Sequence, residues 1–87
     1  MNNVIVAKEN VKEKDKVVKG KHWKWEDQGG YSRYGVIKYI INDDWVSVKW
    51  ENGEMNFYRI GAEGYYDLYF YTEHLTPSLI NRIGHLL

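Results

Sequence analysis

The 87-residue sequence contains no cysteine, and this absence excludes several classes of chemistry. Without thiols the chain has no disulfide framework, no redox pair and no thiolate nucleophile. Zinc sites built from cysteine are excluded too, and His22, His74 and His85 lack the paired spacing of a histidine-based site. We therefore expect neither a metal nor a cofactor.

Long apolar runs are also absent. No stretch approaches the roughly 18–20 residues that a membrane-crossing helix needs, and the apolar start, Val4-Ile5-Val6, is too short for the core of a signal peptide. We expect no membrane insertion and, by default, a cytoplasmic protein.

A net charge of one sign is missing as well, because twelve basic and twelve acidic residues cancel. The charges are nevertheless segregated. Residues 1–24 hold seven lysines and three acidic groups (7 − 3 = +4), whereas residues 25–87 hold five basic and nine acidic groups (5 − 9 = −4). A nucleic-acid binder presents a basic face on its folded body. The acidic body predicted here indicates that nucleic acid is not a partner.

Catalytic motifs are scarce. The serines Ser32, Ser47 and Ser78 lack the Gly-x-Ser-x-Gly context of a nucleophile, and no glycine-rich phosphate loop is present. Carboxylate pairs such as Asp43-Asp44 are typical of solvated turns. We predict that the chain is not an enzyme.

Aromatic residues, in contrast, are abundant: four Trp, eight Tyr and two Phe make up 16% of the chain. A domain this small buries only about 60–65% of its unfolded surface, so large rings are an efficient way to build its core. Two tryptophans, Trp23 and Trp25, fall in a loop-like segment that also contains Gly29-Gly30. A purely solvated loop would not carry them.

Short β-branched and aromatic runs, separated by Gly, Asn and Asp, predict strands with no helix between them. The predicted strands are 16–19, 34–41, 45–51, 54–60 and 66–72. This pattern indicates an all-β fold, a small barrel of about five antiparallel strands.

Asn52-Gly53 predicts a tight hairpin turn between two of these strands, because both residues tolerate positive φ. A two-residue turn would place Val48 opposite Phe57. A turn with Gly53 as a bulge would instead put Tyr58 on the face of Val48. The sequence leaves both registers open. Phe57 is buried in the first register and Tyr58 in the second.

Both ends of the chain differ from this central region. Residues 1–14 are expected to be a flexible leader or an edge strand. In residues 73–87, Thr76-Pro77 predicts the start of a short amphipathic helix, weakened in its middle by Gly84. Its apolar positions either pack on the barrel as a lid or bind a partner, including a second copy in a weak dimer. Those positions are Leu79, Ile80, Ile83, Leu86 and Leu87.

Three motifs resemble the MIB/HERC domain: WKWEDQGG at residues 23–30, WENG at 50–53 and YRIGAEG at 58–64. The resemblance runs in one register from about residue 15 to 70. Two departures lie in loops: the stretch before Gly29-Gly30 is one residue shorter than usual, and Glu51 stands where Asp is typical. We therefore expect the domain to span residues 15–72.

The resemblance implies an SH3-like β-barrel that acts in recognition. MIB/HERC domains occur in E3 ubiquitin ligases of the Mind bomb and HECT types, and in Mind bomb proteins they engage the cytoplasmic tails of Notch ligands. RING and HECT modules need cysteine, which this chain lacks. The sequence thus predicts a non-catalytic module that binds a protein or peptide, as the substrate- or partner-binding domain of an E3 ligase.

An aromatic-lined groove that captures an extended peptide is the mechanism we expect. Acidic side chains, Asp27 with Glu26 and Glu63, would receive basic groups of the ligand. Arg59 would grip a carboxylate, either that of the ligand or one in the turn 63–67. The expected ligand-binding residues are Trp23, Trp25, Asp27, Tyr31, Tyr34, Tyr58 and Arg59.

Two alternatives remain. Rings that converge beside Glu26 or Asp27 would form a cage for methyl-lysine. The domain would otherwise serve only structure or self-association, as a monomer or a weak dimer through the C-terminal helix.

Overall fold

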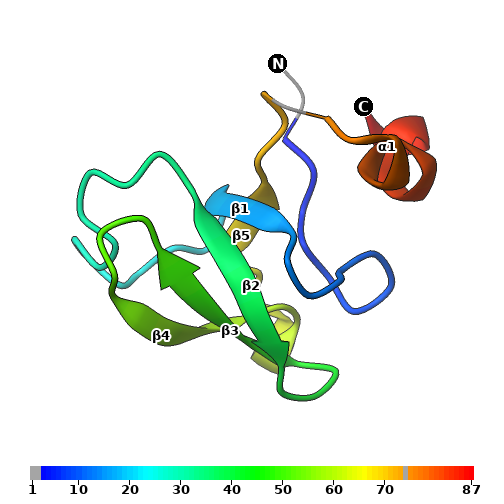
Figure 1. Cartoon of the computed structure of the whole chain (residues 1–87). Helices are drawn as coiled ribbons and strands as arrows, with labels where there is room; N and C mark the ends of the chain where they lie inside the picture. The colour runs from blue at the N-terminus through cyan, green and yellow to red at the C-terminus, as the bar shows by residue number, and fades with distance from the viewer. Residues whose placement is uncertain (1–2, 74) are drawn as a thin grey trace.

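The computed structural model describes residues 3–73 and 75–87, so His74 lies outside the described residues. Five strands form one antiparallel sheet in the order β4-β3-β2-β1-β5 (Figure 1). The strands are β1 (Lys16–Lys19), β2 (Gly35–Ile40), β3 (Trp45–Trp50), β4 (Met55–Arg59) and β5 (Leu68–Phe70). Each strand falls within one of the five predicted runs: β1 has the predicted bounds, and the other four are shorter, β5 most of all.

The sheet curls so that its two edge strands approach each other at one end. Beyond β4, Ile60 pairs with Tyr66 in an antiparallel bridge, and the Asp67 N–H donates to the Arg59 carbonyl (2.9 Å). A short 3₁₀ turn, Ala62–Gly64, connects the two edges. The predicted fold of about five antiparallel strands with a short C-terminal helix is confirmed, and the curled sheet is consistent with an SH3-like barrel.

The β3–β4 hairpin adopts the bulged register. Val46 lies opposite Tyr58 and Val48 opposite Asn56. Gly53, at φ 93°, donates to the Trp50 carbonyl, and the Trp50 N–H donates to the Glu54 carbonyl. Because alternate residues share a face, Tyr58 is buried and Phe57 is 61% exposed.

The core lies inside the curl and centres on Trp50 and Tyr58, whose side chains are joined by a hydrogen bond from the indole N–H to the hydroxyl (2.9 Å). Gly29 lies so close to the Trp50 indole that a Cβ there would approach within 2.7 Å of the ring. Only glycine fits this contact. The buried apolar cluster comprises Val4, Val6, Val17, Ile37, Val46, Val48, Trp50, Tyr58, Ile60, Leu68, Phe70, Leu79 and Ile83.

Residues from both ends of the chain belong to this cluster. The Val6 N–H donates to the Leu68 carbonyl, and Val4 accepts from the Phe70 N–H, so the leading segment runs along β5. Helix α1 (Pro77–Ile83) lies at the right of Figure 1, with the N-terminal segment between it and the sheet. No helix within the described ranges is long and apolar enough to cross a membrane.

The C-terminal helix starts as predicted, because the Thr76 hydroxyl accepts from the Leu79 N–H (3.2 Å) and Pro77 occupies the first turn. It does not continue through Gly84 as α-helix. The last residues form a 3₁₀ turn, Gly84–Leu86. Leu79 and Ile83 are buried, as a lid requires, whereas Ile80 is 46% exposed.

Candidate functional site

A buried ion pair links the two edges of the curled sheet. Arg59, at the end of β4, and Asp67, just before β5, are 6% and 0% exposed. The Arg59 guanidinium donates to both carboxylate oxygens of Asp67, with Nη2 2.7 Å from Oδ1 and Nε 3.0 Å from Oδ2. The Arg59 backbone N–H also donates to Oδ2 (2.8 Å). The carboxylate that Arg59 grips is therefore one of the chain's own.

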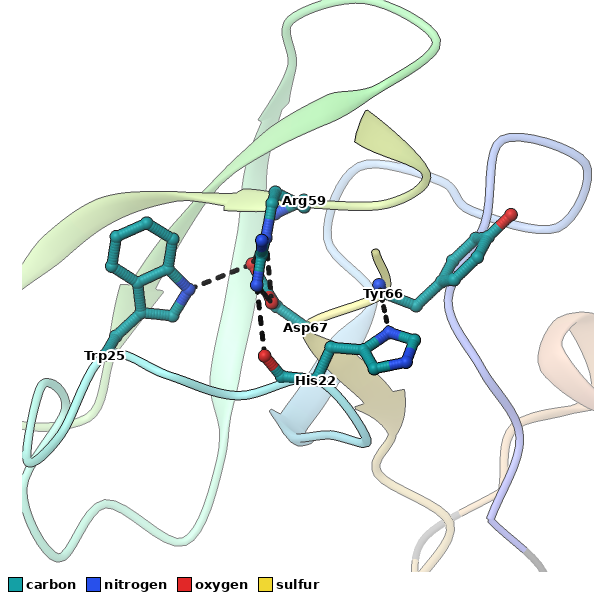
Figure 2. A network of polar contacts seen from close by, with 5 residues as sticks. All are labelled: His22, Trp25, Arg59, Tyr66 and Asp67. Carbon is teal, nitrogen blue, oxygen red and sulfur yellow. Dashed lines mark hydrogen bonds and ion pairs between the residues drawn. The ribbon is translucent and has the colours of Figure 1, made fainter. Parts of the chain in front are cut away.

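The tryptophan-bearing loop is fastened to this pair (Figure 2). The Trp25 indole N–H donates to Asp67 Oδ2 (2.9 Å), and Arg59 Nη2 donates to the His22 carbonyl (3.0 Å). The Tyr66 N–H donates in turn to His22 Nδ1 (2.8 Å), so the histidine ring is an acceptor at that nitrogen. Loop, β4 and β5 are held in one arrangement.

The charge of Arg59 is stabilised from several sides. The hydrogen bond to Asp67 raises the pKa of Arg59 above its ordinary value, against the opposing effect of burial. Its guanidinium also lies 4.4 Å from the centre of the Tyr65 ring and 5.5 Å from that of Trp25, both within cation–π distance. The side chain is thus a rigid, charge-paired platform.

Two shallow hollows open beside this platform. They have volumes of about 310 and 410 Å³ and share Lys24, Arg59 and Glu63. We call them together the Arg59 groove. One hollow is completed by Trp25, Asp44, Trp45 and Ala62, and the other by His22, Trp23 and Tyr65.

The structure gathers only some of the predicted site residues here. Trp23, Trp25 and Arg59 line the groove, but Asp27 is exposed and lines neither hollow. Tyr58 is fully buried, and the Trp23 ring stacks on it at a centroid distance of 5.0 Å. It therefore has no surface for direct ligand contact.

The other two predicted tyrosines lie outside the groove. Tyr31 is fully exposed at a loop tip, with a relative exposure of 105%. Tyr34 packs against Tyr71 (5.1 Å) under the Lys16 ammonium. The four rings of the predicted loop set thus do not converge on one surface.

The rings do not frame an empty cage either. Trp23 and Trp25 both contact Tyr58, at centroid distances of 5.0 and 6.2 Å. Both rings therefore pack on a buried phenol, whereas a cage for a quaternary ammonium needs rings arranged around an open space. This packing gives no support to the methyl-lysine alternative.

Six lining residues were not predicted from the sequence: His22, Lys24, Asp44, Trp45, Ala62 and Tyr65. One signal was available for Trp45. In β3 it alternates with the buried Val46, so it must point to the opposite face of the sheet. No signal pointed to Tyr65, which is placed by the turn geometry between Gly61 and Gly64. Within residues 3–73 and 75–87, no group of three potential metal ligands lies together.

Comparison with known proteins finds one matching domain family and several similar proteins named as ubiquitin ligases. Residues 14–72 match the Mib_herc2 family profile. Over 75 residues, 80% of the chain, it is 44% identical to E3 ubiquitin-protein ligase hecd-1 of Caenorhabditis elegans. Drosophila melanogaster Ufd4 and mind-bomb, also named E3 ubiquitin-protein ligases, are 47% and 45% identical over 61% of the chain. The chain spans only 3%, 2% and 5% of these relatives' lengths.

Proposed function

This chain belongs to the Mib_herc2 family, and from that premise we propose that it is a non-catalytic module that binds a protein or peptide for an E3 ubiquitin ligase. The relatives named as E3 ubiquitin-protein ligases are very much longer than this chain, so the ubiquitin-transfer chemistry can reside elsewhere in them. The 87 residues here contain no cysteine for RING or HECT chemistry. Selecting or positioning a partner is the role that suits such a piece.

The observation that supports this proposal is the Arg59 groove. Tryptophan, tyrosine and arginine are the residues that dominate protein-binding hot spots, and the groove combines Trp25, Trp45, Tyr65 and Arg59. Its platform is fixed by the Asp67 pair, so little side-chain entropy is lost when a ligand binds. An extended peptide is the ligand that fits two shallow, adjoining hollows.

A display library of random twelve-residue peptides, selected on the immobilised chain, tests the proposal. We expect enriched peptides that bind the Trp45→Ala variant at least about tenfold more weakly, as at a hot spot. Trp45 is the appropriate variant because Trp25 is bonded to Asp67, and its removal would disturb the fold as well as the groove.

Tyr31→Ala is the matched control, since it removes an exposed ring that lines neither hollow of the groove. Its peptide binding should equal that of the unaltered chain. The proposal fails if no peptide is enriched over an unrelated protein. Loss of binding in Tyr31→Ala with full retention in Trp45→Ala would also contradict it, because the ligand would then lie elsewhere.

A further inference from the structure

In the part of the chain that the structure describes, the Trp45 side chain differs from those of the other three tryptophans, because it has no hydrogen bond and no ring or cation partner. The indole N–H groups of Trp23, Trp25 and Trp50 donate to the Glu26 carbonyl, Asp67 and Tyr58, at 3.0, 2.9 and 2.9 Å. Each of those rings also contacts another aromatic ring. Among the described residues, the half-buried Trp45 indole has neither a hydrogen bond, nor a ring contact, nor a cation over its face.

Cations of the chain itself already cover the neighbouring ring. The Lys24 ammonium lies 4.8 Å from the Trp25 ring centre and the Arg59 guanidinium 5.5 Å from it. Trp25 is therefore an occupied platform. Trp45 lines the same hollow, and no ring or cation of the described residues lies against its indole, so a cation of a ligand can still use it.

One side of Trp45 is apolar. Together with Ile41, Asn42 and Phe57 it lines a separate hollow of about 360 Å³. The register explains this: Phe57 lies opposite Ser47, so it shares the outer face of the sheet with Trp45, two residues earlier in β3. Ile41 and Phe57 are 50% and 61% exposed, and β4 is an edge strand. This side fits a large apolar side chain.

The other side of Trp45 is acidic. The hollow that it shares with Arg59 contains two exposed carboxylates, Asp44 and Glu63. The Arg59 charge is neutralised by Asp67, and Lys24 is the remaining cation. Residues 25–87, which supply every lining residue of this hollow except Lys24, carry a formal charge of 5 − 9 = −4. Charge complementarity on this side therefore selects a basic group.

We infer that the ligand of this surface is an extended peptide in which a large apolar residue stands next to a lysine or arginine. The apolar side chain enters the hollow of Ile41, Trp45 and Phe57. The basic side chain lies over the free Trp45 face between Asp44 and Glu63. This inference rests on the proposed function and specifies the chemistry of its ligand.

Three synthetic ten-residue peptides of Gly and Ser test the inference; they differ only in a central pair, Phe-Lys, Phe-Glu or Ser-Lys. Each is titrated to millimolar concentration into the ¹⁵N-labelled chain, and the four indole N–H signals are followed. Loss of one signal in Trp45→Phe assigns the Trp45 resonance. We expect the Phe-Lys peptide to shift that resonance and the amides of Ile41 and Phe57.

The expected ranking follows from the two contacts. Ser-Lys should bind at least about tenfold more weakly, because it buries no large apolar side chain. Phe-Glu should bind about two- to fivefold more weakly, which corresponds to the free energy of an exposed ion pair. Asp44→Asn combined with Glu63→Gln should remove the preference for Phe-Lys over Phe-Glu.

Other results overturn the inference. Equal or tighter binding of Phe-Glu, or shifts centred on Trp23 and Tyr65, would do so while the proposed function stands. The same holds if none of the three peptides binds but the display library yields peptides that depend on Trp45. If the library yields no binding peptide either, the proposed function itself is refuted.

Discussion

Asp67 is the single residue on which the site depends most. Its buried carboxylate accepts from the Trp25 indole, from the Arg59 backbone and from the Arg59 guanidinium. A buried ion pair contributes little net stability, but removal of one partner leaves the other charge buried without compensation. The groove and the fold therefore share one vulnerable point.

We predict that Asp67→Asn lowers the free energy of unfolding by about 3–5 kcal/mol, because the Arg59 charge loses its counter-ion. The substitution keeps the size of the side chain, so the loss reports charge and hydrogen bonding and not packing. Urea denaturation followed by tryptophan fluorescence measures it.

Asp27→Asn is the control for the same chemical change, at an exposed carboxylate of the tryptophan loop. It should leave the unfolding midpoint unchanged. Equal unfolding midpoints for the two variants would contradict the prediction, because the buried ion pair would then not be needed for stability.

At this scale the sequence predicted residue types better than residue contacts. Loop position indicated that Trp23 and Trp25 were special, and they do line the groove. It could not show that the Trp25 indole bonds to a carboxylate 42 positions away. Tyr31 and Tyr34, equally well placed in the sequence, received different environments because only the three-dimensional fold decides which ring meets a partner.

Among the elements, the β3–β4 hairpin determines the chemistry of both sheet faces. Its bulge at Gly53 places Tyr58 inside, beneath Trp23 and Trp25, and leaves Phe57 outside, beside Trp45. The other register would exchange the two rings. Asn52-Gly53 predicted the turn but not its type, because both types place positive φ at Gly53. Contacts of Tyr58 with residues far away in the sequence settle the choice.

Gly53→Ala should lower the free energy of unfolding by about 1–2 kcal/mol, the strain of an L-residue in left-handed backbone. A Cβ at Gly53 would meet nothing within 4 Å, so packing adds no further loss. Urea denaturation at neutral pH measures the change.

Gly53→Asn serves as comparison, because asparagine tolerates positive φ and should be less destabilising than alanine. If both substitutions proved equally harmful, or both harmless, the backbone conformation at Gly53 would not be what maintains the turn.

For the molecule as a whole, the core extends beyond the five-stranded sheet. Val4 and Val6 at one end, and Leu79 and Ile83 at the other, join the same buried cluster. The ends are also tied by Arg82, which donates to the Asn10 carbonyl (2.7 Å) and to Asp15 (2.8 Å). Periodicity predicted the helix, but which of its apolar residues face the barrel depends on how the helix packs.

Ile83→Ala should lower the free energy of unfolding by about 2–5 kcal/mol, as expected for a fully buried isoleucine. Thermal and urea unfolding both report this. Ile80→Ala, three positions earlier on the exposed side, should change stability by less than about 0.5 kcal/mol. Comparable losses for the two variants would mean that α1 is covered on both sides, as in a dimer through the helix.

The buried core is larger than the segment that the family profile matches. The segment shared with the family, residues 14–72, omits Val4, Val6, Leu79 and Ile83. A fragment cut to residues 14–72 would expose the apolar surface that these four side chains cover. The boundaries of the family profile therefore do not mark where the buried core of this protein ends.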